Sequence, residues 1–322
     1  MNPASFLLGA LICAGLPGIA AAQSYPVKPV RLIVPFPAGG GSDIVGRIVA
    51  ARLAEQLKQQ VIVDNRGGAG GSIGTEAAAR ATPDGYTLVL ASTSEIAVNP
   101  AIYSRLTYDT VRDLAPIALI ASTPVVIVVH PSLPARNVKE LIALAKARPG
   151  DINVASAGNG TFTHLSGEFF RSLTATTMTH VPYKGAPVAL TDLAAGQVQI
   201  MFSSLPAAVA FINAGKIRPV AVSTARRAES FPDVPTVMES GVPGYEVVYW
   251  YGTFAPAATS KEITGQLHSE TERALRAQDV IANLAKQGAA PGALTQGQFT
   301  EFVKAEHARW GKVARATGIK LD

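Results

Sequence analysis

Hydrophobic positions along the chain follow two alternating patterns. Short apolar runs, typical of buried strands, recur along the sequence. Between them, apolar residues return every three or four positions, which is helical spacing. The first pair is the run 30–36, followed by Ile44, Val45, Ile48, Val49, Leu53 and Leu57. Strands that alternate with helices in this way indicate parallel sheets flanked by helices.

The same patterns predict the remaining elements as far as the C-terminus. Strands are expected at 60–65, 86–92, 124–131, 152–158, 176–183, 198–204 and 217–224. Helices are expected at 72–80, 137–147, 161–173, 186–196, 205–215 and over most of the chain from 261. Two strand–helix connections, 35–43 and 155–165, are rich in glycine, and open α/β sheets bind ligands at the carboxyl ends of their strands. We therefore expect an α/β fold of two lobes, each a mixed or parallel sheet flanked by helices, with the ligand cleft between them.

Composition narrows the kind of ligand. The 322 residues are 48% hydrophobic, enough for two cores, and the formal net charge is +5. Because the basic residues are scattered, the sequence lacks the concentrated basic patch that nucleic-acid binding requires. A mildly positive field suits a protein whose ligand is an anion. The five histidines are far apart and have no H-x-x-x-H spacing or cysteine partner, so no metal site is expected.

The N-terminus has the pattern of a secretory signal. An apolar stretch from Phe6 to Ala20 is followed by small residues and by Gln23, which predicts a signal peptide over 1–22. The only cysteine, Cys13, falls inside this segment, so the mature chain would have no disulfide. A lipid anchor at Cys13 is disfavoured because the bulky Ile12 precedes it.

The first glycine-rich connection has the features of an anion site. Gly39, Gly40 and Gly41 let the backbone approach a ligand closely, and Ser42 or Asp43 can cap the next helix. A helix N-terminus offers unpaired N–H groups and a partial positive charge. An ordinary capped turn would have the same sequence. No lysine follows the glycines, so the G-x-x-x-x-G-K-[ST] motif fails and a nucleoside triphosphate site is disfavoured.

Two further stretches are candidates for ligand contacts. In the second loop, Gly158, Asn159 and Gly160 precede Thr161, whose hydroxyl can cap the next helix or bond a ligand oxygen. His164, in the first turn of that helix, can donate to a carboxylate or serve only in the structure. Tyr183 follows a strand and is a better candidate than its neighbour Lys184.

An enzymatic alternative rests on one short match. Residues 70–74 fit G-x-S-x-G, which would make Ser72 the nucleophile of a secreted hydrolase. In the esterase elbow, however, the serine directly follows a strand, whereas here the expected strand ends near Asn65. The hydrolase reading is therefore the weakest alternative.

Several long motifs resemble one known family. The segments "YPVKPVRLIVPFPAGGGSDIVGRIVAARLAEQL", "VDNRGGAGGSIGTEAAARATPDGYTL", "NVASAGNGTFTHLSGEFF", "VPYKGAPVALTDLAAGQVQIMF" and "FPDVPTVMESGVPGYE" are similar to the tripartite tricarboxylate transporter substrate-binding proteins, also called the Bug family. The similarity covers essentially all of the mature chain. Motifs of this length in the right order are far more specific than a glycine loop.

The resemblance implies a periplasmic binding protein of the type II-like, two-lobed kind. It implies a first lobe of residues 23–124 and 224–322, a second lobe of 125–223, and crossings near 122–126 and 222–225. It also implies no catalysis and no cofactor. The ligand would be a small carboxylate handed to a two-component membrane permease by a monomeric protein. A ligand-sensing role beside a sensor kinase is the alternative.

The resemblance also implies where the ligand is held. The implied contacts come from the first loop, the end of the third strand, the second loop and one tyrosine: Phe36, Pro37, Ala38, Gly39, Gly40, Ser42, Asp43, Ser92, Thr93, Ser94, Gly158, Asn159, Gly160, Thr161, His164 and Tyr183. Trp250 and Tyr251 line the pocket if the ligand is aromatic, or else belong to the core.

One departure from the family pattern bears on the ligand. After "GQVQIMF" many relatives carry an aspartate that can hold a ligand ammonium, but this chain has Ser203 and Ser204 there, which we expect to contact the ligand in its place. An unpaired ammonium in a closed cleft would be costly. We therefore predict a carboxylate without an amino group. Donors in the second loop, at the opposite side of the cleft, favour a dicarboxylate.

Overall fold

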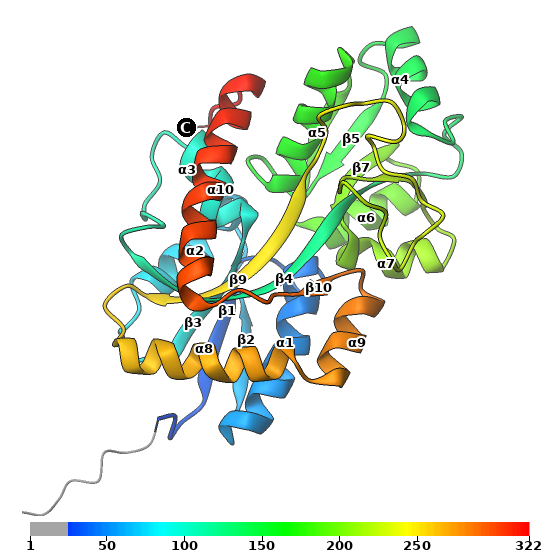
Figure 1. Ribbon diagram of the computed structural model, residues 1–322. Coiled ribbons are helices and arrows are strands. Elements are labelled where there is room, and N and C mark those ends of the chain that lie inside the picture. Colours follow the sequence, from blue (N-terminus) through cyan, green and yellow to red (C-terminus); the bar gives the residue numbers. More distant parts are fainter. Residues whose placement is uncertain (1–24, 322) are drawn as a thin grey trace, which may run out of the picture.

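The computed structural model describes residues 25–321, which form an α/β molecule of two lobes (Figure 1). The predicted signal peptide and Cys13 lie outside the described residues. Every strand and helix expected from the sequence is present, with ends shifted by a few residues except for the strand expected at 124–131, which begins at Leu114. Within residues 25–321, no helix combines the length and apolarity needed to cross a bilayer.

The first lobe is built on strands from both ends of the described chain. Strands β2, β1 and β3 are parallel and adjacent, and β9 pairs with β3 in the antiparallel direction. Its elements are β1 (Val30–Val34), α1 (Gly41–Leu57), β2 (Val61–Asn65), the 3-10 helix η1 (Ala69–Gly71), α2 (Ser72–Ala79), β3 (Thr87–Ser92), the π-helix η2 (Ser94–Val98), α3 (Asn99–Ile102), β9 (Val248–Pro256), α8 (Lys261–Leu275), α9 (Gln278–Lys286), β10 (Ala290–Pro291) and α10 (Gln296–Thr317).

The second lobe repeats the strand–helix rhythm. Strands β6, β5 and β7 are parallel and adjacent. Its elements are α4 (Val138–Ala147), β5 (Asn153–Ser156), α5 (Phe162–Thr174), β6 (Thr179–Pro182), α6 (Ala186–Ala194), β7 (Ile200–Ser204), α7 (Leu205–Asn213) and β8 (Arg218–Val222).

One long strand joins the two sheets. Strand β4 (Leu114–Val129) pairs with β9 as far as Pro124 and with β7 from Val125 onward, all antiparallel. The strand path is therefore β2-β1-β3-β9-β4-β7-β5-β6. Figure 1 shows β4 and β9 running side by side between the lobes. Only residues 124–131 were expected as a strand here, because Pro116, Thr123 and Pro124 interrupt the apolar run before them. In the structure, pairing with β9 extends β4 back to Leu114.

The segment after β8 stays with the second lobe. The Ser223 N–H donates to the Val125 carbonyl at 2.8 Å, and the Val247 N–H donates to the Ser223 carbonyl at 2.9 Å. The Tyr245 hydroxyl donates to the Ser166 carbonyl in α5 at 3.1 Å. We therefore propose that the second crossing lies near residues 247–248 rather than 222–225, which would extend the second lobe from 125 to 247.

Helix α1 shows how the sequence pattern positions the first loop. Val45, Val49, Leu53 and Leu57 are buried on one face, as their spacing predicts. Burying each such side chain contributes about 1.5–3 kcal/mol. Gly46 lets α1 lie close to the sheet, since a Cβ there would lie 3.0 Å from Leu90 Cδ2. This packing fixes the N-terminus of α1 at the carboxyl end of β1.

Candidate functional site

A cavity of about 30 Å³ lies where the two lobes meet. The first lobe contributes residues that follow β1 and β3 and one residue of β9; the second contributes residues that follow β5 and β6 and the end of β7. The lining residues are Phe36, Pro37, Gly40, Gly41, Ser42, Ser94, Ala157, Thr161, Thr163, Ala186, Pro187, Ser204 and Tyr249. The cavity thus occupies the strand ends where open α/β sheets bind ligands.

Four helix N-termini meet at this cavity. Gly40, Thr161 and Ser204 are the N-cap residues of α1, α5 and α7, and all three line the cavity. The fourth helix, α6, begins at Ala186, which also lines it. No side chain caps α1, α6 or α7. Because uncapped N–H groups and the helix dipoles both favour negative charge, the arrangement suits an anion.

The lining is otherwise uncharged. Among the described residues that line the cavity, none carries a formal charge. The polar side chains are hydroxyls: Ser42, Ser94, Thr161, Thr163, Ser204 and Tyr249. Hydroxyls and backbone N–H groups can donate to a carboxylate, whereas nothing in this lining would neutralise an ammonium.

Asp43 supports the first loop without lining the cavity. Its carboxylate accepts hydrogen bonds from the Gly39 N–H at 2.9 Å, the Arg47 Nε at 2.9 Å and the Asn65 Nδ2 at 3.0 Å. Burial by itself would raise the pKa of Asp43, but these hydrogen bonds and the Arg47 charge outweigh it and lower the pKa. Gly39 has φ +80°, a conformation that favours glycine. Asp43 therefore fixes the turn that brings Phe36, Pro37, Gly40 and Ser42 to the cavity, while Ala38 and Gly39 belong to the turn itself.

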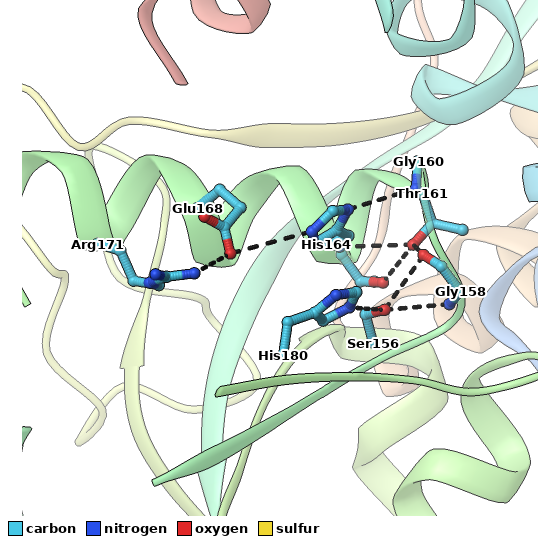
Figure 2. Close-up of polar contacts among 9 residues, drawn as sticks. Ser156, Gly158, Gly160, Thr161, His164, Glu168, Arg171 and His180 are labelled. Atoms are coloured by element: carbon cyan, nitrogen blue, oxygen red, sulfur yellow. Dashed lines mark hydrogen bonds and ion pairs between the residues drawn. The ribbon is translucent and has the colours of Figure 1, made fainter. Parts of the chain in front are cut away.

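The His164 side chain supports the second loop, and Figure 2 shows its contacts with that loop. Its Nδ1 accepts the Gly160 N–H at 3.3 Å, and its ring stacks on His180 with centroids 3.8 Å apart. His180 Nε2 lies 2.7 Å from the Ser156 hydroxyl, which in turn bonds the backbone of Gly158. Burial lowers the pKa of both histidines to about 4. The stacked pair is thus neutral at pH 7 and braces the loop.

The second loop itself places one predicted side chain in the cavity. Thr161 caps α5 by accepting the His164 N–H and also donates to the Gly158 carbonyl at 2.7 Å. Gly158 and Gly160 have φ of +134° and +74° and shape the turn. Neither they nor Asn159 line the cavity; the Asn159 carbonyl accepts from the Tyr103 hydroxyl at 3.4 Å across the lobes.

Four other predicted residues point elsewhere. The Ser92 hydroxyl donates to Glu95, and the Thr93 hydroxyl accepts the Trp250 N–H at 3.0 Å. The Ser203 hydroxyl lies 3.1 Å from the Ser204 carbonyl, so only Ser204 of that pair lines the cavity. The Tyr183 hydroxyl donates to Asp192 at 2.8 Å, away from the cavity lining.

Five lining residues were not predicted to contact the ligand: Ala157, Thr163, Ala186, Pro187 and Tyr249. Ala157 and Thr163 lie within the second glycine-rich connection, 155–165, and Ala186 and Pro187 begin the helix expected at 186–196. Tyr249 had only a weak signal in the sequence. Successive side chains of a strand face opposite sides, so a strand over 248–254 would place Tyr249 and Tyr251 on one face and Trp250 on the other. Tyr249 and Tyr251 share one face, and Trp250 faces Glu306 of α10, to which its Nε1 donates at 2.8 Å. Trp250 and Tyr251 are fully buried and do not line the cavity.

The lobes contact each other around the cavity. The Phe162 N–H donates to the Ser94 hydroxyl at 3.0 Å, and the Phe162 ring packs on Tyr249 with centroids 4.5 Å apart. A Cβ on Gly185 would lie 2.7 Å from Pro37 Cγ, so these two residues are also in close contact. The structure is therefore a closed arrangement of the lobes.

Neither catalysis at Ser72 nor a metal centre finds support in the geometry. Ser72 begins α2 after a 3-10 turn rather than directly after a strand, and its hydroxyl accepts from the Asn99 Nδ2 at 3.1 Å. In the described part of the chain, no three His, Cys, Asp or Glu side chains gather as they would around a metal ion.

Comparison with known proteins places the chain in one family. The model of the tripartite tricarboxylate transporter family receptor matches residues 45–319. The chain is 38% identical over 309 residues to BugT of Bordetella pertussis, covering 96% of this chain and 95% of BugT.

Solved structures agree with the sequence comparison. A Rhodopseudomonas palustris protein solved with adipate superposes with a TM-score of 0.90 at 38% identity, covering 92% of this chain and 99% of that one. MatC from the same species, with bound malate, gives a TM-score of 0.86 at 32% identity, covering 90% and 99%. The two-lobed fold, the cavity between the lobes and these matches agree: the chain belongs to the tripartite tricarboxylate transporter receptor family, whose members are periplasmic solute-binding proteins rather than enzymes.

Proposed function

We propose that this protein captures a small carboxylate without an amino group and delivers it to a two-component permease of the tripartite tricarboxylate type. The observation that supports this best is the cavity itself. Four helix N-termini and six hydroxyls surround it, and its lining carries no charged side chain. Such a site stabilises an anion by dipoles and hydrogen bonds alone.

The same lining disfavours an amino acid. An ammonium group would need a carboxylate or several acceptors, and Ser204 stands where such a carboxylate would reach the cavity. Leaving a buried ammonium unpaired costs several kcal/mol, so on the order of a hundredfold or more in affinity would be lost. Two relatives of known structure were solved with adipate and malate, which supports a dicarboxylate as the class to test first.

Capture works through closure of the two lobes in this proposal. The lobes are in contact around the cavity, so they must part to admit a dicarboxylate and close again around it. Strands β4 and β9 are the connections at which this rotation would occur. A ligand that contacts both Gly40–Ser42 and Thr161 favours the closed form, because only there are both sets of donors within reach.

The test is a binding measurement on the purified protein at fixed salt, by thermal shift and calorimetry. The panel pairs adipate with 2-aminoadipate and malate with aspartate, and adds citrate. A ligand at about 100 times its Kd contributes about 2.7 kcal/mol, which raises the Tm by several degrees. We expect this rise for a carboxylate and none for its amino-bearing partner. A rise with the amino acids instead would contradict the predicted ligand class.

Delivery to the permease needs a test in cells. Deleting the permease genes should abolish uptake of the ligand while the binding protein is still present. The opposite outcome is that uptake survives deletion of the permease genes, while deletion of the binding protein abolishes only ligand-dependent gene induction. That pair of results would favour signalling through a sensor kinase. The monomeric state stays a prediction.

A further inference from the structure

A buried carboxyl group lies behind the cavity without lining it. Glu95, in the first turn of η2, has no exposed surface. Its Oε2 accepts the Ser92 N–H at 3.1 Å and the Ser92 hydroxyl at 2.5 Å, while its Oε1 has no hydrogen-bond partner among the described residues. Because an ionised carboxylate is costly in such a place, burial raises the pKa of Glu95 to about 7, against the opposing bonds from Ser92.

A chain of hydroxyls connects this carboxyl group to the cavity. The Tyr249 hydroxyl donates to the Ser92 hydroxyl oxygen at 2.8 Å, and the Ser92 hydroxyl donates to Glu95. Tyr249 lines the cavity, and its hydroxyl lies close enough to Ser42 and Ser94 for hydrogen bonds to affect its pKa. The order from the cavity inward is therefore Tyr249, Ser92, Glu95.

The protonation state of Glu95 decides which way this chain points. An ionised carboxylate can only accept, so Ser92 and then Tyr249 must donate inward, and the tyrosine oxygen turns lone pairs toward the cavity. A protonated Glu95 can donate to Ser92, which then donates to Tyr249, which leaves the tyrosine hydrogen free to point into the cavity. Only the second arrangement offers a donor to an anion.

The other groups around Glu95 do not supply a positive charge that would hold it ionised. The titratable side chains coupled to it are three tyrosines: Tyr108, whose hydroxyl donates to the Glu95 carbonyl, and Tyr249 and Tyr251 on β9. Gly71, just before α2, contacts the carboxyl group, since a Cβ there would lie 3.0 Å from Oε1. Within the described chain, no charged side chain contributes to the shift in the Glu95 pKa.

We propose that the protein takes up one proton at Glu95 when it binds an anion in the cavity, so that Tyr249 can donate a hydrogen bond to that anion. The proton comes from the bulk buffer and adds to a Glu95 oxygen; Ser92 and Tyr249 only rotate their O–H groups, and no other covalent bond changes. The inference rests on the proposed function, since it takes the anion to be the carboxylate cargo. Glu95 would then act as a positioning residue for Tyr249.

The experiment measures the proton directly. Carboxyl ¹³C NMR of protein labelled in its glutamates gives the titration of Glu95, and Glu95→Gln identifies its signal. Adipate is the probe, and calorimetry in phosphate and in Tris at pH 8 reports protons taken up on binding. We expect adipate to raise the pKa of Glu95 by about two units or more. The binding enthalpy should then differ between the two buffers by an amount close to that of one proton, and the affinity should fall about fivefold or more per pH unit between about pH 7 and 9. In Glu95→Gln the affinity should no longer depend on pH in this range.

Two tyrosine variants separate the relay from general packing. Tyr249→Phe removes the link and should abolish the proton uptake, while Tyr108→Phe, which loses an equally buried hydroxyl outside the relay, should keep it. If adipate binds and the Glu95 titration does not move, the proposal is wrong.

The ligand-free protein keeps the relay testable if adipate and the other carboxylates fail to bind. In that case the proposed function fails, and the relay is judged alone. Tyr249→Phe should then raise the pKa of Glu95, because Ser92 loses the donor that orients its own hydroxyl toward the carboxylate. An unchanged titration in that variant would overturn the coupling between Glu95 and Tyr249.

Discussion

The two glycine loops at the cavity have the same local design but different supports. Each leads from the carboxyl end of a parallel strand to a helix N-terminus, and each brings backbone N–H groups to the cavity. The first loop is held by an ionised carboxylate, Asp43, in the first turn of α1. The second is held by two neutral imidazoles, His164 and His180.

Two loops of the same local design are therefore held by opposite electrostatic means, one by a charged group and the other by neutral groups. Asp43 has its charge compensated by Arg47 and by the N-terminus of α1, so its pKa is lowered and the support persists at neutral and mildly acidic pH. The histidine pair contacts a loop that attracts an anion in the proposed function, and it does so without charge because both rings are buried. We therefore expect acid to disturb the second loop before the first.

The largest effect is expected from a bulky side chain at Gly41, where the first loop lies against the second lobe. A Cβ on Gly41 would lie 2.4 Å from Ser204 Oγ and 2.6 Å from the Tyr251 hydroxyl, so Gly41→Val should hold the lobes apart. Overpacking of about 1–3 kcal/mol would weaken carboxylate binding about 5- to 150-fold. Calorimetry on the purified variant measures this loss.

Gly265→Val is the control for that substitution. Gly265 lies in α8, outside the cavity lining, and a Cβ there would meet nothing within 4 Å, so the affinity should be unchanged. Unimpaired binding in Gly41→Val would show that the ligand is not enclosed by these two lobes at this point.

The next effect concerns the support of the first loop. Asp43→Asn removes the negative charge of the carboxylate to which Arg47, Asn65 and the Gly39 N–H donate hydrogen bonds. It should lower the free energy of unfolding by about 1–2 kcal/mol. Urea denaturation at pH 7 measures the change. Affinity for the carboxylate should fall as well, because asparagine keeps only one acceptor oxygen for the three donors that hold the turn at Gly39. A variant as stable as the original would mean that the turn is held by the glycines alone.

A smaller and pH-dependent effect is expected at the second loop. The folded-state pKa of His164 and His180 is about 4, below the ordinary value, so their contribution to stability is complete above about pH 6.5. It is lost as the pH falls toward 4, because the unfolded chain takes up protons first. The Tm should drop over this interval by only a few degrees, because solvent partly screens the charges of the two protonated rings.

The double variant His164→Asn, His180→Asn is the control for this pH dependence. It should lose that part of the slope between pH 6.5 and 4 and keep the steeper fall below pH 4 that carboxylates such as Asp43 produce. An identical slope in both proteins would assign the pH dependence to other groups.

The smallest effect is expected at Tyr183, which the sequence analysis favoured as a ligand contact. The Tyr183 hydroxyl bonds Asp192 in α6 rather than reaching the cavity. Tyr183→Phe should change the unfolding free energy by less than about 0.5 kcal/mol and leave the affinity within twofold. A tenfold loss of affinity, measured in the same calorimetric assay, would place Tyr183 at the ligand after all.

How far the sequence predicts this protein depends on the range of the interaction concerned. The strands and helices follow from local periodicity, and the two loops follow from glycines next to helix caps. Strand β4 was predicted at little more than a third of its length because its first part exists through pairing with β9, which lies far along the chain. Thr163 and Tyr249 were missed as lining residues for the same reason, since only the packing of the lobes brings them together.

The sequence by itself therefore determined the alternation of strands and helices, the two glycine-rich loops at strand ends, the serines at positions 203 and 204 where many relatives have an acidic residue, and the family. These are properties of contiguous residues, whose backbone conformation and capping are settled within a few positions of the chain. The tertiary structure alone decided which side chains face the cavity and which brace it, because that depends on contacts between segments. It places Asp43 and His164, both predicted to contact the ligand, outside the cavity lining, where they support the two loops. It also connects the buried Glu95 through Ser92 to Tyr249, which lies more than 150 positions away in the sequence and lines the cavity.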